Sequence, residues 1–458
     1  MPKIISTNPS QNYAIIGEVE ISADNEVAAK VQSANAAKLM WKELGVEKRI
    51  EMLRPLYEKF AAKKEEFALL ITKEMGKPIS QSTSEMQGAL EEIKWFLDNG
   101  AAALKNEITH EDAESIHQIV YEPFGTAAVI TPWNFPFAMF VWGTFPNLIA
   151  GNTVVFKITE ECPLTGKLIE AVMNSADLPL GVFSEVYGAG DIGHKLATSD
   201  VNLIWFTGST KVGKELYKIA ADKFIKALLE MGGSSPAIVF EDADLDKAVA
   251  QLYEERFNNC GQVCDAIKRL IVHESIYAEV TGKLIAELKT KKIGNPQEQD
   301  TDISSLVAKR QQDLLASQVQ DAIDKGAKVE FVKEIPQELQ GAYYPPTILT
   351  DIKTDMRVWK EEVFGPVLPI VTFKTEEEAV RLANDTCYGL GSRIYTKDTE
   401  KAKRIASKIE AGTVEINNVS RWHSKNPFGG YKSSGMGREL GTVGFRELCQ
   451  IKVMSAEI

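Results

Sequence analysis

Short apolar runs alternate with helical segments along the middle of the 458-residue chain, and this alternation constrains the fold most strongly. From residue 127 onward, the pattern predicts strands at 127–131, 153–157, 184–187 and 203–206, separated by helices at 138–149, 164–175, 193–197 and 211–221. Strands that alternate with helices form βαβ units and a parallel sheet. Such a sheet binds ligands at the carboxyl ends of its strands.

Other regions extend this pattern in both directions. Residues 24–70 have helical periodicity, and further strands are expected at 237–240, 268–273, 367–373 and 392–395. Residues 108–122 alternate like a hairpin, and 448–454 could add a third strand to it. Because a chain of this length exceeds a single core, we expect two or three domains.

Composition narrows the classes of protein that the chain can belong to. The net charge of -12 argues against nucleic acid or an anionic membrane as the main partner, because both repel an acidic surface. The five cysteines are odd in number and match no disulfide framework, which favours a reducing cytoplasm. Neither a signal peptide nor an apolar run long enough for a membrane span is recognised.

One cysteine lies in a loop that suits a nucleophile. Residues 257–264 read FNNCGQVC and end at Cys264, between two structured elements. A thiolate is the reactive form of cysteine, and loops present such groups to substrate. Cys260 and Cys264 lack a second pair of ligands at zinc spacing, so no metal site is predicted. A reversible disulfide between these two cysteines is a hypothesis that rests on their proximity in sequence.

Two other segments carry groups that such a nucleophile needs. Residues 229–236 read LEMGGSSP, and Glu230 among apolar and small neighbours can act as a general base with a raised pKa. Residues 130–136 read ITPWNFP, at the carboxyl end of the first strand. The Asn134 amide can donate a hydrogen bond to a developing oxyanion there.

Six motifs in order give the chain a resemblance to a known family. PWNFP, FTGST, E-x-GG, GQVC, EEVFGPV and the PFGG segment that ends in GRE occur as in the aldehyde dehydrogenase superfamily. The chain resembles the shorter bacterial members, including succinate-semialdehyde dehydrogenases. The resemblance implies NAD(P)-dependent oxidation of an aldehyde to a carboxylic acid through a cysteine thiohemiacetal and thioester.

The same resemblance implies a fold and an assembly. It implies an α/β protein with a variant Rossmann cofactor domain (1–107 and 124–231), an α/β catalytic domain (232–430) and a small β oligomerisation arm (108–123 and 445–458). An arm of this kind leaves an unpaired edge strand in a monomer, so we expect a homodimer or a homotetramer.

Residue roles follow from the motif positions. Cys264 matches the nucleophile, Glu230 the general base that activates water, and Asn134 the oxyanion ligand. The positions of Cys264 and Glu230 differ by 34 (264 minus 230), as is usual in the family. The implied cofactor-binding residues are Thr131, Trp133, Lys157, Glu160, Gly208, Ser209, Glu362 and Phe364.

The cofactor is predicted to be NAD rather than NADP. Glu160 can accept hydrogen bonds from both ribose hydroxyls of NAD and would repel a 2′-phosphate, whereas Lys157 could tolerate one. Residues 188–193 read GAGDIG, but they follow the third predicted strand and not the first. These glycines are therefore assigned to turn geometry, and the helix that begins after FTGS is assigned to the pyrophosphate.

The physiological aldehyde is left open by the sequence. Succinate semialdehyde is one candidate, but the two arginines that bind its distal carboxylate in relatives of the well-known type correspond here to Trp142 and Asn258. Arg421 or His423 could bind an anion instead. Alternatively, Trp142, Phe137 and Trp422 could form an aromatic pocket for an uncharged aliphatic or aromatic aldehyde.

Three other functions were weighed. A CoA-acylating aldehyde dehydrogenase commonly lacks the base that Glu230 supplies. A cysteine hydrolase has no use for the cofactor residues Lys157, Glu160, Ser209 and Glu362. A protein that kept the fold and lost the chemistry has no reason to retain Cys264, Glu230 and Asn134 together.

Overall fold

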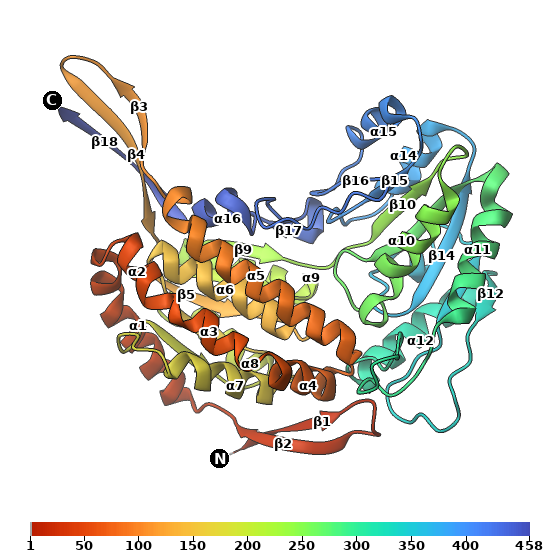
Figure 1. Cartoon of the computed structure of the whole chain (residues 1–458), viewed down its shortest axis with the longest axis horizontal. Helices are drawn as coiled ribbons and strands as arrows, with labels where there is room; N and C mark the ends of the chain where they lie inside the picture. Colours follow the sequence, from red (N-terminus) through yellow and green to blue (C-terminus); the bar gives the residue numbers. More distant parts are fainter. Residues whose placement is uncertain (1) are drawn as a thin grey trace.

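The computed structural model describes residues 2–458, which form two α/β bodies and a protruding arm (Figure 1). Four sheets are present in this part of the chain, with six, seven, three and two strands. The two large sheets lie in the two bodies. The three-stranded sheet forms the arm, where both β3 and the C-terminal strand β18 reach out from the first body.

The first body contains a sheet with the strand order β17-β9-β8-β5-β6-β7. Its strands are β5 (Thr126–Ile130), β6 (Thr153–Lys157), β7 (Phe183–Val186), β8 (Leu203–Thr207), β9 (Lys226–Glu230) and β17 (Gly435–Met436). All pairs are parallel except β17 with β9, where Gly435 is paired with Glu230.

Helices cover both faces of this sheet because successive residues of a strand point to opposite sides. Ala127 and Val129 pack against the core that contains α4 to α6, whereas Ala128 and Ile130 pack against α1, α8 and α9. The helices of this body are α1 (Asp24–Glu43), α2 (Val46–Leu53), α3 (Pro55–Ala61), α4 (Lys64–Met75), α5 (Ile79–Ala103), α6 (Pro136–Ala150), α7 (Pro163–Asn174), α8 (Gly190–Thr198), α9 (Thr210–Lys223) and α16 (Gly441–Glu447).

The second body contains a sheet with the order β12-β13-β14-β11-β10-β15-β16. Its strands are β10 (Ser235–Val239), β11 (Ile267–His273), β12 (Lys328–Val332), β13 (Thr347–Thr350), β14 (Val367–Phe373), β15 (Arg393–Tyr395) and β16 (Glu415–Ile416). Its helices are α10 (Leu245–Phe257), α11 (Tyr277–Thr290), α12 (Lys309–Asp324), α13 (Arg357–Lys360), α14 (Glu376–Asn384) and α15 (Thr399–Ala406). One core packs under α10 to α12 and another under α14 and α15.

The arm consists of β3 (Glu107–Glu111), β4 (Ser115–Pro123) and β18 (Cys449–Glu457). Each neighbouring pair is antiparallel, and β18 pairs with β4 over its whole length. Apolar side chains such as Ile108, Ile451 and Val453 are exposed on it. A separate hairpin near the N-terminus joins β1 (Lys3–Asn8) to β2 (Ala14–Glu20).

The predicted α/β class with a small antiparallel arm is confirmed. The strand expected at 153–157 and the one expected at 367–373 have the bounds that the structure gives them. The hairpin β1–β2 and strands β12 and β13 were not foreseen. The domain boundaries given above stay a prediction. No helix within residues 2–458 combines the length and the apolar character that crossing a membrane requires.

Candidate active site

Cys264 lies in the loop between α10 and β11, as the sequence predicted for a nucleophile. The loop begins with a short helical turn in which Asn259 and Cys260 have positive φ angles of 49° and 55°. Burial raises the pKa of the Cys264 thiol to about 12, while Lys268 and Arg421 act in the opposite direction. The thiol is therefore protonated in this state, and attack requires a neighbouring change of charge or solvation.

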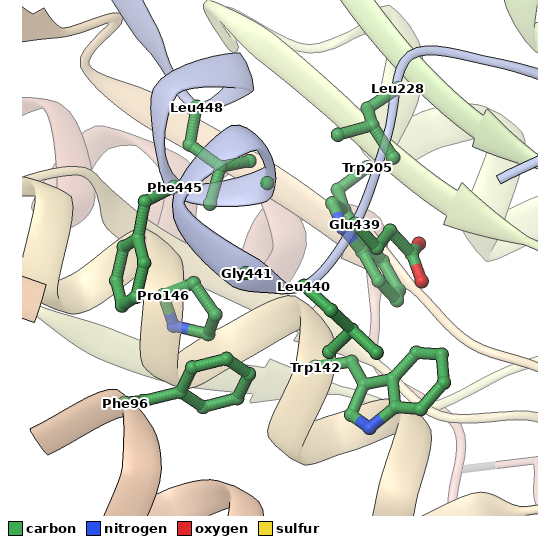
Figure 2. A pocket seen from close by; sticks show the side chains of 11 residues that line it. Phe96, Trp142, Pro146, Trp205, Leu228, Glu439, Leu440, Gly441, Phe445 and Leu448 are labelled. Carbon is green, nitrogen blue, oxygen red and sulfur yellow. The ribbon is translucent and has the colours of Figure 1, made fainter. Parts of the chain in front are cut away.

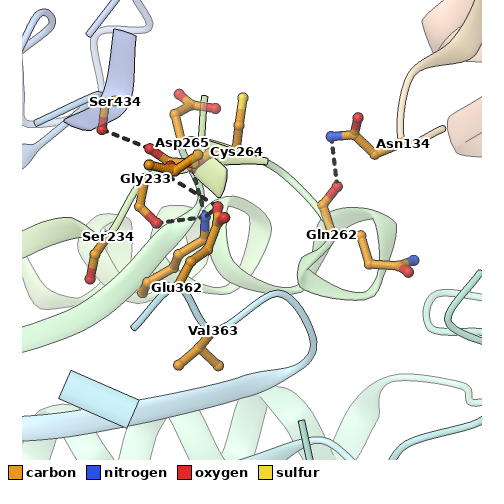
Figure 3. A network of polar contacts seen from close by, with 12 residues as sticks. Asn134, Gly233, Ser234, Gln262, Cys264, Asp265, Glu362, Val363 and Ser434 are labelled. Carbon is orange, nitrogen blue, oxygen red and sulfur yellow. Dashed lines mark hydrogen bonds and ion pairs between the residues drawn. The ribbon is translucent and has the colours of Figure 1, made fainter. Parts of the chain in front are cut away.

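Asn134 is held against the same loop. Its side-chain amide donates to the backbone carbonyl of Gln262 over 3.1 Å (Figure 3), and its backbone carbonyl accepts from the side-chain amide of Asn259 over 3.0 Å. An amide group has two donor hydrogens, so one is left for a further acceptor. The residue follows β5, and the loop precedes β11, so the two bodies meet here.

A cavity of about 390 Å³ opens on Cys264 from the side of the first sheet. It is lined by residues of five of the six motifs, among them Trp133, Asn134, Gly208, Ser209, Gly232, Cys264, Glu362 and Phe364. The Trp133 and Phe364 rings meet edge to face with centroids 5.4 Å apart. Seven of the eleven catalytic and cofactor residues predicted from the motifs thus line this cavity: Trp133, Asn134, Gly208, Ser209, Cys264, Glu362 and Phe364.

This cavity fits a dinucleotide. Ser209 caps the N-terminus of α9, where free backbone N–H groups and the helix dipole favour a phosphate. Gly232 leaves room that a side chain would fill, since a Cβ there would collide with the Glu362 carboxylate. Thr131 precedes Pro132, which lines the cavity, and the buried hydroxyl of Thr131 has no hydrogen-bond partner within the described chain.

Lys157 and Glu160 lie farther along the same edge of the sheet. Lys157 ends β6, is buried, and has its Nζ 3.6 Å from Glu160 Oε2. Burial lowers the pKa of Lys157, and Glu160 opposes this. Helix α8 approaches them, because a Cβ on Gly193 would lie 3.7 Å from Lys157 Cδ. Neither residue lines the cavity on Cys264, so a bound dinucleotide would have to extend along the strand ends to reach them.

Glu230 ends β9 and is fully buried beside a second acid. Burial raises its pKa well above the ordinary value, and Glu439 adds to this while Arg438 opposes it. Figure 2 shows Glu439 against a void of about 10 Å³ among Trp142, Trp205 and Leu440, where burial raises its pKa in the same way. The Glu230 carboxylate does not line the cavity on Cys264, and its two oxygens have no hydrogen-bond partner among residues 2–458.

A model described as "Aldehyde dehydrogenase family" matches residues 2–454. The chain belongs to this family. A betaine aldehyde dehydrogenase of Bacillus subtilis (strain 168) is 38% identical over 421 residues, which are 90% of this chain and 85% of the relative. The "Succinate-semialdehyde dehydrogenase [NADP(+)]" of Escherichia coli (strain K12) is 34% identical over 98% of this chain and 93% of its own length.

Solved structures agree with this membership. A crystal structure of a betaine aldehyde dehydrogenase from Staphylococcus aureus in complex with NAD+ has a TM-score of 0.93 and 32% identity, covering 99% of this chain and 91% of its own. One of an "E. coli NADP dependent enzyme" has a TM-score of 0.95 and 33% identity, with 100% and 95% covered. This protein is thus an NAD(P)-dependent aldehyde dehydrogenase, and NAD and NADP both occur among its relatives.

A larger cavity of about 710 Å³ lies on the other side of the Cys264 loop of this aldehyde dehydrogenase. Phe135, Val263 and Asp265 line it. In contrast, Asn134, which precedes Phe135, and Cys264, which lies between Val263 and Asp265, line the first cavity. The loop of Cys264 therefore separates two cavities. The second one is acidic, with Glu85, Glu254, Glu255, Asp265, Asp300 and Asp302 and no lysine or arginine in its lining.

Of the four residues proposed for substrate, only Asn258 lines this second cavity. It donates to Glu254, whereas the Trp142 indole donates to Glu92 and lines only the small void of Figure 2. His423 is exposed, and its Nδ1 accepts from the amide of Lys425. Phe137, expected in an aromatic pocket, instead packs in the core between Phe60 and Phe67.

Arg421 is buried and already paired with acids of this chain. It contacts Asp265 and lies 3.1 Å from Glu415, and Arg393 lies 3.4 Å from Asp265 and also contacts Glu255. Two arginines thus face three carboxylates in one cluster. A substrate anion would have to displace one of these carboxylates, which differs from the free arginine that the sequence suggested.

Three functional neighbours escaped the sequence analysis. The sequence predicts Lys268 only as the start of a strand and Glu439 only as part of a motif, and it indicates no role for Asp265 beside Cys264. Lys268 lies four residues after Cys264, and Asp265 lies one residue after it. A charged residue this close to a candidate nucleophile is a sequence signal that could have identified both. Cys260 faces away from the cavities, because its Sγ accepts from the amide of Ser304 inside the core of the second body.

Proposed function

We propose that Cys264 is the nucleophile of this aldehyde dehydrogenase, with Asn134 and Glu230 as its oxyanion ligand and general base. One observation carries this proposal. Cys264 lines a cavity whose residues suit a dinucleotide, its neighbours Val263 and Asp265 line a second, open cavity, and the Asn134 amide lies against the same loop. The loop of Cys264 thus lies between the cavity proposed for the cofactor and the cavity proposed for the aldehyde.

The first step begins when the Cys264 thiol loses its proton to solvent, and the resulting thiolate attacks the aldehyde carbon. The new C–S bond makes that carbon tetrahedral, and the negative charge moves onto the aldehyde oxygen. The free hydrogen of the Asn134 amide and the backbone N–H of Cys264 donate to this oxyanion. When bound, NAD(P)+ supplies an acceptor for the hydride of that carbon.

Glu230 acts in the second half of the reaction. Cys264 then carries the acyl group as a thioester, and an ionised Glu230 takes a proton from water, which attacks the carbonyl carbon. The C–S bond breaks, and the carboxylic acid leaves with the thiol restored. Glu230 must turn toward Cys264 to do this, and the turn breaks no hydrogen bond because its oxygens have no partner in their present position.

The cofactor side is proposed to prefer NAD. Lys157 and Glu160 would hold the adenine ribose, Ser209 and Gly208 the pyrophosphate, and Glu362 with Phe364, Thr131 and Trp133 the nicotinamide end. Glu160 lies within 3.6 Å of Lys157 and partly neutralises it. A 2′-phosphate would meet this carboxylate and lose much of the attraction of the ammonium group.

The substrate is proposed to be an uncharged or cationic aldehyde rather than a dicarboxylic semialdehyde. The open cavity is lined by six acids without a basic residue, and the buried cations behind it, Arg393 and Arg421, are outnumbered by their carboxylate partners. A second carboxylate would therefore be repelled. The betaine aldehyde relative fits this charge better than the succinate-semialdehyde relative does.

Cofactor reduction at 340 nm with a panel of aldehydes tests cofactor and substrate together. We expect kcat/KM for betaine aldehyde or a short aliphatic aldehyde to exceed that for succinate semialdehyde by about fivefold or more, since one like-charge contact costs at least about 1 kcal/mol. NAD should be the better cofactor throughout. Succinate semialdehyde as the best substrate would mean that Arg421 releases its acids, and reduction only with added CoA would favour the acylating alternative.

The arm is proposed to join two copies of the chain, giving a homodimer or a tetramer of dimers. Its strand β18 exposes Ile451, Val453 and Met454, and β3 and β18 are the unpaired edges of the sheet. Light scattering should give a mass of two or four times 50.6 kDa, and deletion of residues 449–458 should reduce it. A monomeric full-length protein would contradict this role of the arm.

A further inference from the structure

Lys268 is a buried cation that links three of the motifs. It follows the first residue of β11, and no part of its side chain is exposed. Its Nζ donates to the carbonyl of Cys264 over 2.7 Å and to that of Gly233 over 2.9 Å, and it forms an ion pair with Glu362 Oε1. An ammonium group has three donors, so all of them are used.

The position of Glu362 depends on this contact. Its Oε1 accepts from Lys268 and from the amide of Gly233 over 3.0 Å, and its side chain lines the cofactor cavity (Figure 3). Arg256, also buried, donates to the carbonyls of Val363 and Gly365 and so holds the loop of Glu362 from behind. Within residues 2–458, Lys268 is thus the only side chain that forms an ion pair with this carboxylate.

We propose that Lys268 is a positioning residue of the active site, whose ammonium group orients Glu362 toward the cofactor cavity and keeps a positive charge beside the Cys264 thiol. The inference rests on the proposed function in that Cys264 is taken as the nucleophile and Glu362 as a cofactor ligand. Lys268 itself touches neither reacting atoms nor solvent, and its three bonds hold it in place.

Four charged groups act on the Cys264 thiol. Lys268 and Arg421 favour the thiolate, whereas Glu362 and Glu230 disfavour it, and burial outweighs them all. Loss of Lys268 should therefore make the thiol less acidic, and loss of the Glu362 charge should make it more acidic. Both losses should weaken cofactor binding, because each removes the oriented carboxylate. The two losses should thus change the acidity of the thiol in opposite directions but weaken cofactor binding alike. A general disruption of the site would change both properties in the same direction in both variants.

The test measures alkylation of Cys264 by iodoacetamide at about pH 8, below the ordinary thiol pKa, with Cys387 as an internal reference. Cys387 is exposed, and mass spectrometry of peptides follows both residues in one sample. We expect Lys268→Met to slow alkylation of Cys264 about tenfold, because loss of a nearby positive charge should raise the thiol pKa by about one and so lower the thiolate fraction tenfold. Glu362→Gln should accelerate alkylation. The conservative Lys268→Arg should restore most of the rate. NAD binding, followed by calorimetry, should weaken about tenfold in Lys268→Met and Glu362→Gln.

Lys77→Met provides a matched control. Lys77 is equally buried and paired with Glu85, but its ammonium faces Cys162 rather than Cys264. It should leave the Cys264 rate unchanged. Equal rates in Lys268→Met and Lys77→Met, or a parallel change at Cys387, would overturn the inference. Either result together with an inactive Cys264→Ala enzyme would leave the proposed function standing, whereas an active Cys264→Ala enzyme would refute that function itself.

Discussion

Replacing Cys264 with alanine should abolish aldehyde-dependent reduction of the cofactor. Without the sulfur, the aldehyde carbon cannot become tetrahedral on the enzyme, and no thioester can form. We expect kcat to fall by about a thousandfold or more, which corresponds to about 4 kcal/mol of lost transition-state stabilisation. Cofactor binding should persist, because the other residues of the cavity remain. Steady-state rates at 340 nm and calorimetry with NAD measure the two effects separately.

Cys387→Ala is the control for this change. Cys387 is exposed and lines neither of the two large cavities, so its loss should leave the rate near that of the wild type. The account would be wrong about the nucleophile if Cys264→Ala kept more than a small fraction of the activity, or if Cys387→Ala lost as much.

Replacing Glu230 with glutamine should separate the two halves of the reaction. Glutamine cannot take a proton from water, so the thioester on Cys264 should form and then persist. We expect one equivalent of reduced cofactor per subunit in a rapid burst, followed by a steady rate about a hundredfold to a thousandfold lower than that of the wild type. Stopped-flow absorbance at 340 nm resolves the burst from the steady rate.

The pH dependence of the steady rate gives a second test of Glu230. Burial and Glu439 raise the pKa of this carboxyl group well above its ordinary value, so its ionised fraction still grows at pH values where an ordinary glutamate is already fully ionised. A base works only when ionised, and kcat of the wild type should therefore increase with pH in this range. The increase should be lost in Glu230→Gln and kept in Glu43→Gln, a change of an exposed glutamate in α1. A Glu230→Gln enzyme with no burst and an unchanged profile would exclude this role.

Local sequence patterns were sufficient to predict the strands and helices whose formation depends on their own short segments. The βαβ alternation predicted β5 to β8 and the helices between them, because β5, β6 and β8 are short runs of buried, mostly apolar residues. The hairpin β1–β2 was missed, since its partly exposed strands carry no apolar run of that kind. Strand β17 is two residues long and exists only because it pairs with β9, more than 200 residues away.

The same distinction applies to the site. The motifs assigned Asn134, Cys264 and Glu362 to one site, because each residue is identified by its own short segment. All three line one cavity. The pairing of Arg421 with Asp265 joins residues more than 150 positions apart, and no pattern in either segment indicates it. The sequence therefore suggested that Arg421 could bind a substrate anion, because its carboxylate partners cannot be identified from local sequence. The orientation of Glu230 away from both cavities is likewise a property of packing.

The most direct test of the account is the mass of the enzyme caught between its two half-reactions. Glu230→Gln protein is mixed with NAD and a good aldehyde, quenched in acid within the burst, digested and analysed by mass spectrometry. The account predicts that the peptide containing Cys264 gains the mass of the acyl group, and that Cys264→Ala gains nothing. Cofactor reduction without any adduct, or with the adduct on another residue, would contradict oxidation through a thioester on Cys264.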